Sequence, residues 1–411
     1  MRLLVSNIGT LAGVETTGKL RLQGGEMKTL GQQDNAWLLA ENGEISAFGS
    51  MEDMPSGGFV VDEEVDARGG TVLPSWCDPH THIVYAGSRE GEFVDKIMGL
   101  SYAEIARRGG GILNSSDLLH TLSEDELYRQ AMHRAEEIMR KGTGCVEIKS
   151  GYGLNTADEL KMLRVIRRIK ESVPMHVVST FLGAHAVGRQ YGHDEYVNLI
   201  INEMLPEVGR EHLADYVDVF CDEGFFTPED TDRILDAAAK WGMKPKIHVD
   251  ELAATGGLPV AVRHGALSVD HLENMPESEL DILRDSVTMP TVLPGTSFFL
   301  NMPYAPARKM LDAGLGVAVA SDYNPGSTPS GDMKFVVSLA CIKMRLLPQE
   351  AINAATLNSA YAMGLSGEYG SITVGKAANF FITEPIPSVD YIPYAYTSPI
   401  ISKVFLNGKE A

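Results

Sequence analysis

Cysteine is scarce in this sequence, with 4 among 411 residues, and no two cysteines form a CxxC pair. Their wide spacing argues against a disulfide framework and against a thiolate zinc knuckle. We expect buried free thiols at Cys77, Cys145, Cys221 and Cys341. The sequence also lacks an apolar run long enough to span a membrane, and its start, Met1–Val5 followed by Asn7, is too short and polar for a signal peptide. These absences predict a cytoplasmic protein with no membrane partner.

Basic residues are fewer than acidic ones: the chain has 35 lysines and arginines and 55 aspartates and glutamates, which gives a formal net charge of −20. Such a field repels nucleic acid and acidic membranes at long range, so no nucleic-acid partner is expected. A small anionic substrate would therefore need a local cation inside its pocket. The hydrophobic share of 44% is typical of a globular protein with a sizeable core.

No GxGxxG motif follows an early strand, and no tandem repeat or low-complexity tract occurs. The middle of the chain instead alternates between apolar, β-branched runs and amphipathic stretches. Capping-box patterns at Ser123…Glu126 and Thr156…Glu159 open two of the expected helices. Eight apolar runs begin near Val72, Cys145, Met175, Val217, Lys246, Leu267, Val287 and Val317. This alternation predicts the α/β class, with a (β/α)₈ TIM-type barrel over residues 71–364 and an open doubly wound sheet as the alternative.

Both ends of the chain have a different pattern, with short strands separated by turns. Asn42-Gly43 between two apolar runs is a strong hairpin signal. We therefore expect one small β-sandwich domain composed of residues 1–70 and 365–411. The expected strands cover residues 3–11, 37–40, 44–48, 60–65, 370–374, 378–383 and 400–407.

Metal-binding chemistry is suggested by the segment Asp78–His82, in which two histidines are separated by one residue. Alternate residues of a strand point to the same side, so both imidazoles can face one ion. His248 and Asp322 follow later strands, and barrel enzymes gather their reactive groups at these carboxyl ends. Asp322 could instead be a turn residue, and Glu251, three residues after His248, could be a solvated charge.

Other polar residues near strand ends admit plainer explanations. Lys149 is expected to be a salt-bridge partner inside the barrel, and Arg89 could be an exposed surface arginine. An isolated histidine is more often a hydrogen-bonded structural residue than a ligand. That expectation applies to His120, His133, His176, His193, His212 and His264.

Longer motifs make the sequence recognisable: residues 78–90, 109–112, 147–154 and 321–327. On these motifs the chain resembles the amidohydrolase superfamily and, within it, the imidazolonepropionase family, essentially from end to end. The resemblance implies one divalent or trivalent metal ion per chain, zinc or iron, held by His80, His82, His248 and Asp322. Residues 217–225 contain no lysine of the kind that bridges two metals in binuclear relatives.

The resemblance also implies an activity, the hydrolysis of 4-imidazolone-5-propanoate to N-formimidoyl-L-glutamate in histidine degradation. Asp322 would take a proton from water, His271 would steady the oxyanion, and Glu251 would move a proton to the departing ring nitrogen. Arg89 would offer a bidentate fork to the substrate carboxylate. The full set implied to bind substrate is Arg89, Tyr102, Tyr152, His185, Glu251, Asn324, Gly326 and Ser327.

Two other functions are open at this point. A deaminase acting on a cytosine-like or guanine-like ring would use the same ligands, but would have less use for Arg89 and Tyr152. A barrel without activity, serving as a binding or scaffold protein, is disfavoured because the full ligand set is present. The residues do not separate zinc from iron. The residues do not determine the number of subunits either, although barrels of this size often form homodimers.

Overall fold

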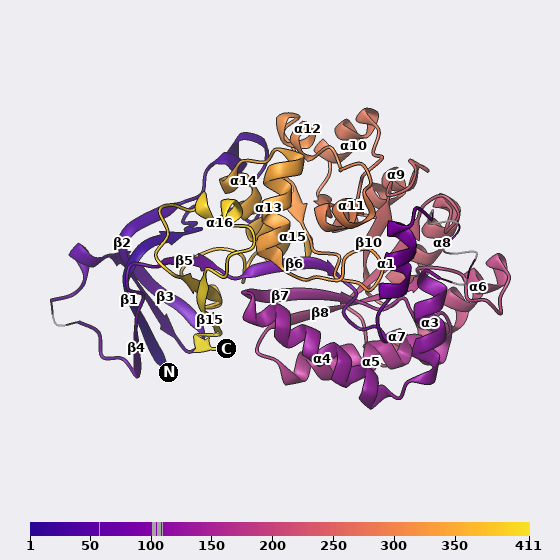
Figure 1. The fold of residues 1–411 in the computed structure, drawn as a ribbon, viewed down its shortest axis with the longest axis horizontal. Helices are drawn as coiled ribbons and strands as arrows, with labels where there is room; N and C mark the ends of the chain where they lie inside the picture. The colour runs from indigo at the N-terminus through magenta and orange to yellow at the C-terminus, as the bar shows by residue number, and fades with distance from the viewer. Residues whose placement is uncertain (57, 101–103, 105–107, 109) are drawn as a thin grey trace.

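The computed structural model describes residues 1–56, 58–100, 104, 108 and 110–411. Two sheets of eight strands each form the framework, and they lie side by side along the long axis of the molecule (Figure 1). Within the described residues, no helix combines the length and apolar character needed to cross a membrane.

One sheet is a parallel barrel in which each strand pairs with its sequence neighbours. The segment after the last strand closes it. Thr81 and Tyr323 form a parallel bridge, and the backbone N–H of Asp322 donates to the carbonyl of His80 over 3.0 Å. The strands are β6 (Trp76–Thr81), β7 (Thr143–Lys149), β8 (His176–Ala184), β9 (Tyr216–Cys221), β10 (Lys244–Val249), β11 (Ser268–His271), β12 (Met289–Val292) and β13 (Ala318–Val319). The predicted α/β barrel is confirmed.

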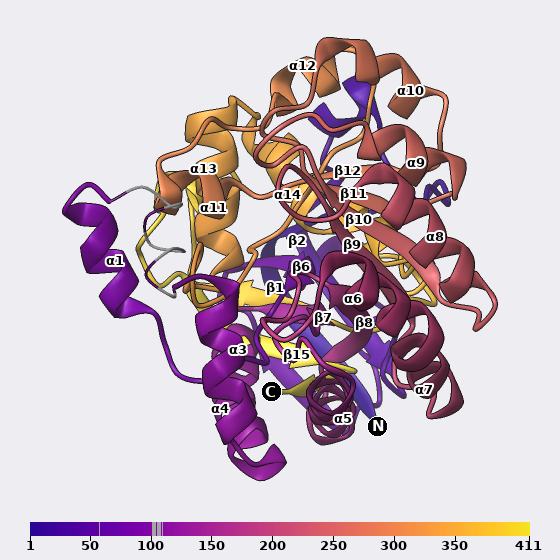
Figure 2. The ribbon, with the colours of Figure 1, turned by 90° about the vertical axis from the view of Figure 1, so that its right-hand side faces the viewer.

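Helices surround these strands, as the end view in Figure 2 shows. On the first half of the barrel they are α1 (Glu90–Ile97), α3 (Ile112–Thr121), α4 (Glu124–Arg140), α5 (Thr156–Ser172), α6 (His193–Leu199), the π-turn η3 (Ile200–Met204), α7 (Leu205–Arg210) and α8 (Pro228–Ala239). The second half has α9 (Gly257–Arg263), the 3₁₀ turn η4 (Glu277–Glu279), α10 (Leu280–Arg284), α11 (Pro294–Leu300), α12 (Ala307–Asp312), α13 (Met333–Met344), α14 (Pro348–Ala355), α15 (Leu357–Ala362) and α16 (Tyr391–Tyr394).

The two capping predictions have different outcomes. Ser123 caps α4, because its side chain accepts the backbone N–H of Glu126, as expected. The prediction for Thr156 is wrong, since Asn155 is the N-cap of α5 and accepts the backbone N–H of Asp158. Glu159 instead folds back and accepts the backbone N–H groups of residues 151, 153 and 154, so it shapes the loop after β7.

Both chain ends build the other, mixed sheet, and both termini lie on it (Figure 1). Asn42 and Gly43 have φ of 53° and 91°, as the predicted tight hairpin requires. The elements are β1 (Arg2–Ala12), the 3₁₀ turn η1 (Gly24–Lys28), β2 (Gln32–Glu41), β3 (Glu44–Ser50), the 3₁₀ turn η2 (Met51–Asp53), β4 (Glu63–Asp66), β5 (Thr71–Pro74), β14 (Phe380–Thr383), β15 (Ile401–Leu406) and β16 (Lys409–Glu410).

Two predicted strands differ from the structure. The apolar run at Thr71–Leu73 is β5 of the terminal sheet, where it pairs with β1 and β14, and the barrel begins at Trp76. Residues 370–374 form no strand, only an isolated bridge between Val14 and Ile372. The division of the chain into domains at residues 70/71 and 364/365 stays a prediction.

Candidate metal centre and active site

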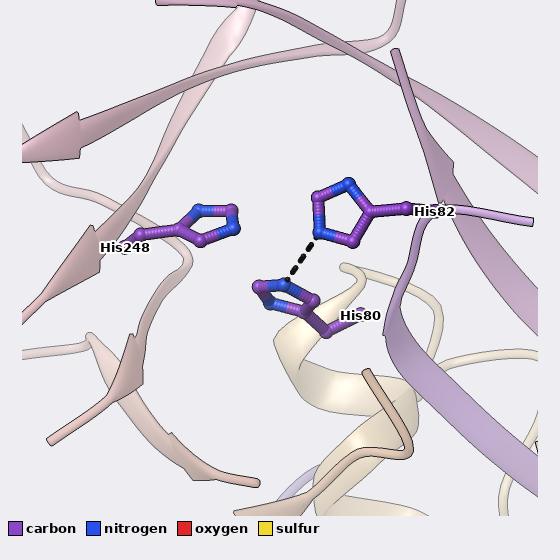
Figure 3. Close-up of side chains that lie close together, drawn as sticks. All are labelled: His80, His82 and His248. Carbon is purple, nitrogen blue, oxygen red and sulfur yellow. Dashed lines mark hydrogen bonds between the residues drawn. The ribbon is translucent and has the colours of Figure 1, made fainter. Parts of the chain in front are cut away.

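Three buried histidines meet at the carboxyl ends of the barrel strands (Figure 3). His80 and His82 come from β6 and its end, and His248 comes from β10. One ring nitrogen from each lies within 4.8 Å of the others, and the Nε2 atoms of His80 and His82 are 3.2 Å apart. The barrel therefore brings all three rings together.

Buried carboxylates lie against the outer nitrogens of two of these rings. Nδ1 of His80 is 2.7 Å from Oδ2 of Asp270, and Nδ1 of His248 is 2.9 Å from Oδ2 of Asp218. The hydrogen bond at His80 fixes the tautomer and orientation of its ring and leaves its Nε2 for an ion. At His248 the carboxylate places a negative charge beside Nδ1 without hydrogen-bond geometry. Among the described residues, Nε2 of His248 has no hydrogen-bond partner, which fits that use.

Lys149 contacts both of these carboxylates. Its Nζ lies 2.8 Å from Asp218, 2.6 Å from Glu147 and 3.6 Å from Asp270. Lys246 forms a second ion pair with Glu147. The prediction that Lys149 is a salt-bridge partner is confirmed, and the same contacts show that it positions the supports of both His80 and His248.

The electrostatics of the candidate metal centre favour neutral rings at His80 and His82. Burial, with Lys149 nearby, holds the pKa of His80 well below its usual value, and burial also lowers the pKa of His82. Neutral imidazole is the form that binds metal. Three imidazoles with one carboxylate make a donor set that suits zinc or iron, so these residues fit such an ion.

Asp322, in the loop after β13, brings a carboxylate close to the rings of His80 and His82. Its Oδ1 lies 3.5 Å from Nε2 of His82 and 3.6 Å from Nε2 of His80. Its Oδ2 accepts the hydroxyls of Thr296 (2.6 Å) and Ser327 (3.1 Å). One oxygen therefore faces the histidines while hydroxyl donors fix the other, which argues against a role for this side chain in the turn alone.

The backbone at these strand ends is strained. Asp250, His271, Leu272 and Asp322 all have positive φ, at 56°, 85°, 70° and 53°. Left-handed conformations are uncommon for residues other than glycine, and they cluster at functional sites where the surrounding structure holds them in place. The strain lies next to the proposed ligands and aims the side chains of His271 and Asp322 inward.

Glu251 and His271 form a second ionisable group in the site. Nδ1 of His271 lies 3.7 Å from Glu251 and 3.6 Å from Glu273. Burial opposes charge on His271, but these two carboxylates outweigh it and raise the pKa of His271 well above its usual value. Burial, together with Glu273, raises the pKa of Glu251 to about 8, although His271 opposes the shift. The pair can therefore both donate and accept a proton near neutral pH.

A cavity of about 480 Å³ opens onto these groups. Tyr152 and His185 form one wall, and His185 donates from Nδ1 to the carbonyl of Gly151 over 3.0 Å. Most of the residues predicted to bind substrate line this cavity: Arg89, Tyr152, His185, Glu251, Asn324, Gly326 and Ser327. Tyr102 lies outside the described residues.

The loop after β13 shapes one side of the cavity. The amide of Asn324 is used within this loop, because its Oδ1 accepts the backbone N–H groups of Gly326 and Ser327 and its Nδ2 donates to the carbonyl of Asp322. Gly326 lies against Arg89, since a Cβ built at Gly326 would be 2.3 Å from Nη1 of the guanidinium. Asn324 therefore holds the loop, and Gly326 makes room for the arginine.

Four of the histidines predicted to be structural have ordinary partners away from the cavity. His193 and His264 lie 2.9 Å and 2.7 Å from the carboxylates of residues 230 and 232. Nε2 of His120 lies 2.8 Å from the carbonyl of residue 153, and Nδ1 of His176 lies 3.1 Å from the hydroxyl of Tyr369. His133 and His212 do not line the cavity either.

Comparison with known proteins places this barrel in a family. The amidohydrolase family model matches residues 71–411. The chain belongs to the amidohydrolase family. A protein named imidazolonepropionase from Christiangramia forsetii is 56% identical over 411 residues, with 100% of both chains covered. One of the same name from Flavobacterium psychrophilum is 52% identical over the same coverage.

A solved structure shows the same fold at low sequence identity. An adenosine deaminase from Xanthomonas campestris with bound zinc superimposes with a TM-score of 0.74 at 16% identity, covering 99% of this chain and 92% of that one. Identity this low supports the amidohydrolase fold and nothing about the reaction.

Three residues that shape this amidohydrolase site escaped the sequence reasoning as functional residues. Asp218 supports His248 and Thr296 holds Asp322, as described above. Asp222 accepts the backbone N–H groups of residues 251–253 and so fixes the loop that carries Glu251. A carboxylate in the middle of the buried run 216–221 was the one signal that could have revealed Asp218.

Proposed function

We propose that this chain hydrolyses 4-imidazolone-5-propanoate to N-formimidoyl-L-glutamate, a step of histidine degradation. The observation that carries the proposal is a single cavity lined both by histidines of the candidate metal centre and by the cation Arg89. A cyclic amide with a carboxylate tail needs a metal centre beside its ring and a cation beside its carboxylate. Full-length relatives at 56% and 52% identity that are named imidazolonepropionase support the same reaction.

His80, His82, His248 and Asp322 would hold one zinc or iron ion. Such an ion, when bound, makes water nucleophilic near neutral pH and polarises a carbonyl oxygen. The proposal of a single ion rests on these four residues, and the choice between zinc and iron is left to metal analysis because the donor set suits both.

The side chains of the site would divide the proton transfers between them. Hydrolysis adds the oxygen of water to the ring carbonyl carbon, breaks the C–N bond and delivers a proton to the ring nitrogen. Oδ1 of Asp322 would accept a proton from the attacking water. His271, whose pKa is raised well above its usual value, would stabilise the developing oxyanion as an imidazolium. Glu251, whose pKa is raised to about 8, would carry the proton to the departing nitrogen.

The remaining residues of the cavity would bind and orient the substrate. Arg89 would approach the carboxylate, and Tyr152 and His185 would flank the ring. Asn324, Gly326 and Ser327 would shape the wall formed by the loop after β13. Tyr102 keeps its proposed contact as a prediction from sequence alone.

A substrate panel tests this function against the deaminase alternative. Purified protein of known metal content is given freshly generated imidazolonepropionate and, separately, cytosine and guanine. We expect loss of the ring absorbance, formation of formimidoylglutamate and no ammonia from either base. Ammonia release from a base, with imidazolonepropionate unchanged, would assign the site to a deaminase.

The location and assembly predicted from the sequence stay predictions. The cytoplasmic location can be checked by cell fractionation, and the homodimer by the molar mass of the purified protein in solution. The proposed reaction needs only a small-molecule substrate and requires neither outcome.

A further inference from the structure

The short helix α1 presents two cations to the cavity. Arg89 precedes its first residue and Lys96 lies in its last turn, seven residues later, so that both can be on one face of the helix. Both line the cavity that contains the histidines. Phe93 of α1 stacks on Phe299, with ring centroids 5.3 Å apart, which places the helix beside α11 at the edge of the end view (Figure 2).

The charge of Arg89 is already matched by a protein carboxylate. Its Nε and Nη2 both donate to Oε2 of Glu92, over 2.9 Å and 2.7 Å. Glu92 is itself fixed, because its Oε1 accepts the backbone N–H of Gly111 and the amide of Asn114. Glu92 therefore holds the guanidinium in place and offsets its charge, which leaves Nη1 facing Gly326.

Lys96 differs from Arg89 in its contacts with carboxylates. Among the described residues, no carboxylate oxygen lies within 4.0 Å of its Nζ, and its one hydrogen bond goes to the carbonyl of Gly326 over 2.7 Å. The ammonium also lies 5.5 Å from the centre of the Phe299 ring. A lysine ammonium has three donors, so two remain for a ligand. Within the described part of this chain, whose net charge is −20, Lys96 is thus a half-buried cation without a salt bridge, and Glu92 acts on it only at longer range.

We propose that Lys96 is a specificity-determining residue, which supplies the unmatched positive charge that pairs with the carboxylate of the anionic substrate. Arg89, whose charge Glu92 offsets, then acts mainly as a fixed hydrogen-bond donor. The inference rests on the proposed function, because it takes the substrate to be a ring with a carboxylate tail.

The test compares a charged and a neutral substrate in the wild type, Lys96→Met and Lys96→Arg. The substrates are imidazolonepropionate and its propionamide counterpart, which differ only in the charge of the tail. Lys96→Met should raise KM for the acid roughly tenfold to a hundredfold, as expected for the loss of a charge-assisted hydrogen bond. KM for the amide should stay within about twofold, and Lys96→Arg should preserve most of the preference for the acid.

Two outcomes would overturn the proposal. An equal loss on both substrates would show that Lys96 only fastens α1 to the loop, and an unchanged KM for the acid would show that it does not meet the carboxylate.

Binding of two inert probes separates this inference from the proposed reaction. Imidazole-4-propanoate and 4-ethylimidazole are titrated calorimetrically into the wild type and into Lys96→Met. We expect the acid to lose affinity in the variant while the neutral probe does not, and the opposite pattern would contradict the role of Lys96. A wild type that binds the acid through Lys96 but does not hydrolyse imidazolonepropionate would overturn the proposed function alone.

Discussion

Nζ of Lys149 lies 2.8 Å from Oδ2 of Asp218, the same oxygen that lies 2.9 Å from Nδ1 of His248. One carboxylate oxygen thus joins a buried ammonium to an imidazole of the candidate metal centre. Burial raises the pKa of Asp218, but His248 and this ammonium outweigh the effect of burial and keep the pKa below its usual value. The charge of Lys149 therefore helps to orient the site, although it reaches His248 only through Asp218.

Lys149→Met tests this network. The substitution leaves Glu147, Asp218 and Asp270 buried, and among the described residues Lys246 is then the one lysine paired with this group. The free energy of unfolding should therefore fall by about 3–5 kcal/mol. Affinity for zinc should fall roughly tenfold to a hundredfold, because the supports of His80 and His248 lose their orientation. Urea unfolding with and without chelator measures the first effect, and zinc titration measures the second.

Lys141→Met is the matched control for that variant. Lys141 pairs with Glu137 at 2.8 Å, but about a third of each side chain is exposed. The substitution should cost less than about 1 kcal/mol and leave zinc affinity unchanged. Similar losses in the two lysine variants would mean that the buried network has no special role.

His248→Ala should remove both metal and activity, since it deletes one of the imidazoles grouped within 4.8 Å. Metal content per chain and formimidoylglutamate formation are measured on the same sample. His264→Ala serves for comparison, because His264 lies 2.7 Å from Asp232 and outside the cavity, and it should keep both properties. A His248→Ala protein that retains metal and turns over substrate would show that this histidine is not a ligand.

Gly326→Ala should raise KM with little effect on kcat. The added Cβ would lie 2.3 Å from Nη1 of Arg89, so the guanidinium must move away from the cavity wall. Gly91→Ala, at a position where a Cβ meets no atom within 4 Å, should behave like the wild type. If Gly326→Ala changes kcat alone, the contact with Arg89 does not bear on binding.

Substrate binding should weaken at alkaline pH. Burial, with Arg89 nearby, lowers the pKa of Lys96 from 10.5 to about 8, although Glu92 opposes the shift. The charge is present below that value and is lost as the pH rises through it, so KM for imidazolonepropionate should be constant below about pH 7 and rise above about pH 8. Lys96→Arg keeps its charge throughout this range and should flatten the profile. The same alkaline rise in both proteins would assign it to another group.

The fold was largely predictable because its signals are local. The alternating runs gave the barrel, and Asn42-Gly43 gave the hairpin. The first barrel strand was misplaced because Thr71–Leu73 and Trp76–Cys77 are both buried apolar runs, separated only by Pro74 and Ser75. Periodicity shows that such a run is a strand, but the sheet it joins depends on pairing with β14, some 300 residues later.

Some residues of the candidate site could likewise be found from local patterns in the sequence, and others could not. His80 and His82 could be found from their spacing, and His248 and Asp322 from their places at strand ends. Asp218, Asp222 and Thr296 could not be assigned roles, because each acts through a contact with a residue about 26 to 30 positions away. Such contacts depend on the register of the barrel and on the course of its loops, which no local pattern specifies.

The most direct test of metal-dependent hydrolysis at this site is a titration of metal-stripped protein with zinc, and separately with ferrous iron, while formimidoylglutamate formation is followed. If His80, His82, His248 and Asp322 hold one ion as proposed, activity should be absent at first, rise in proportion to added metal and level off at one ion per chain. Full activity without metal, or a plateau only at two ions per chain, would contradict the single-metal site proposed for this enzyme.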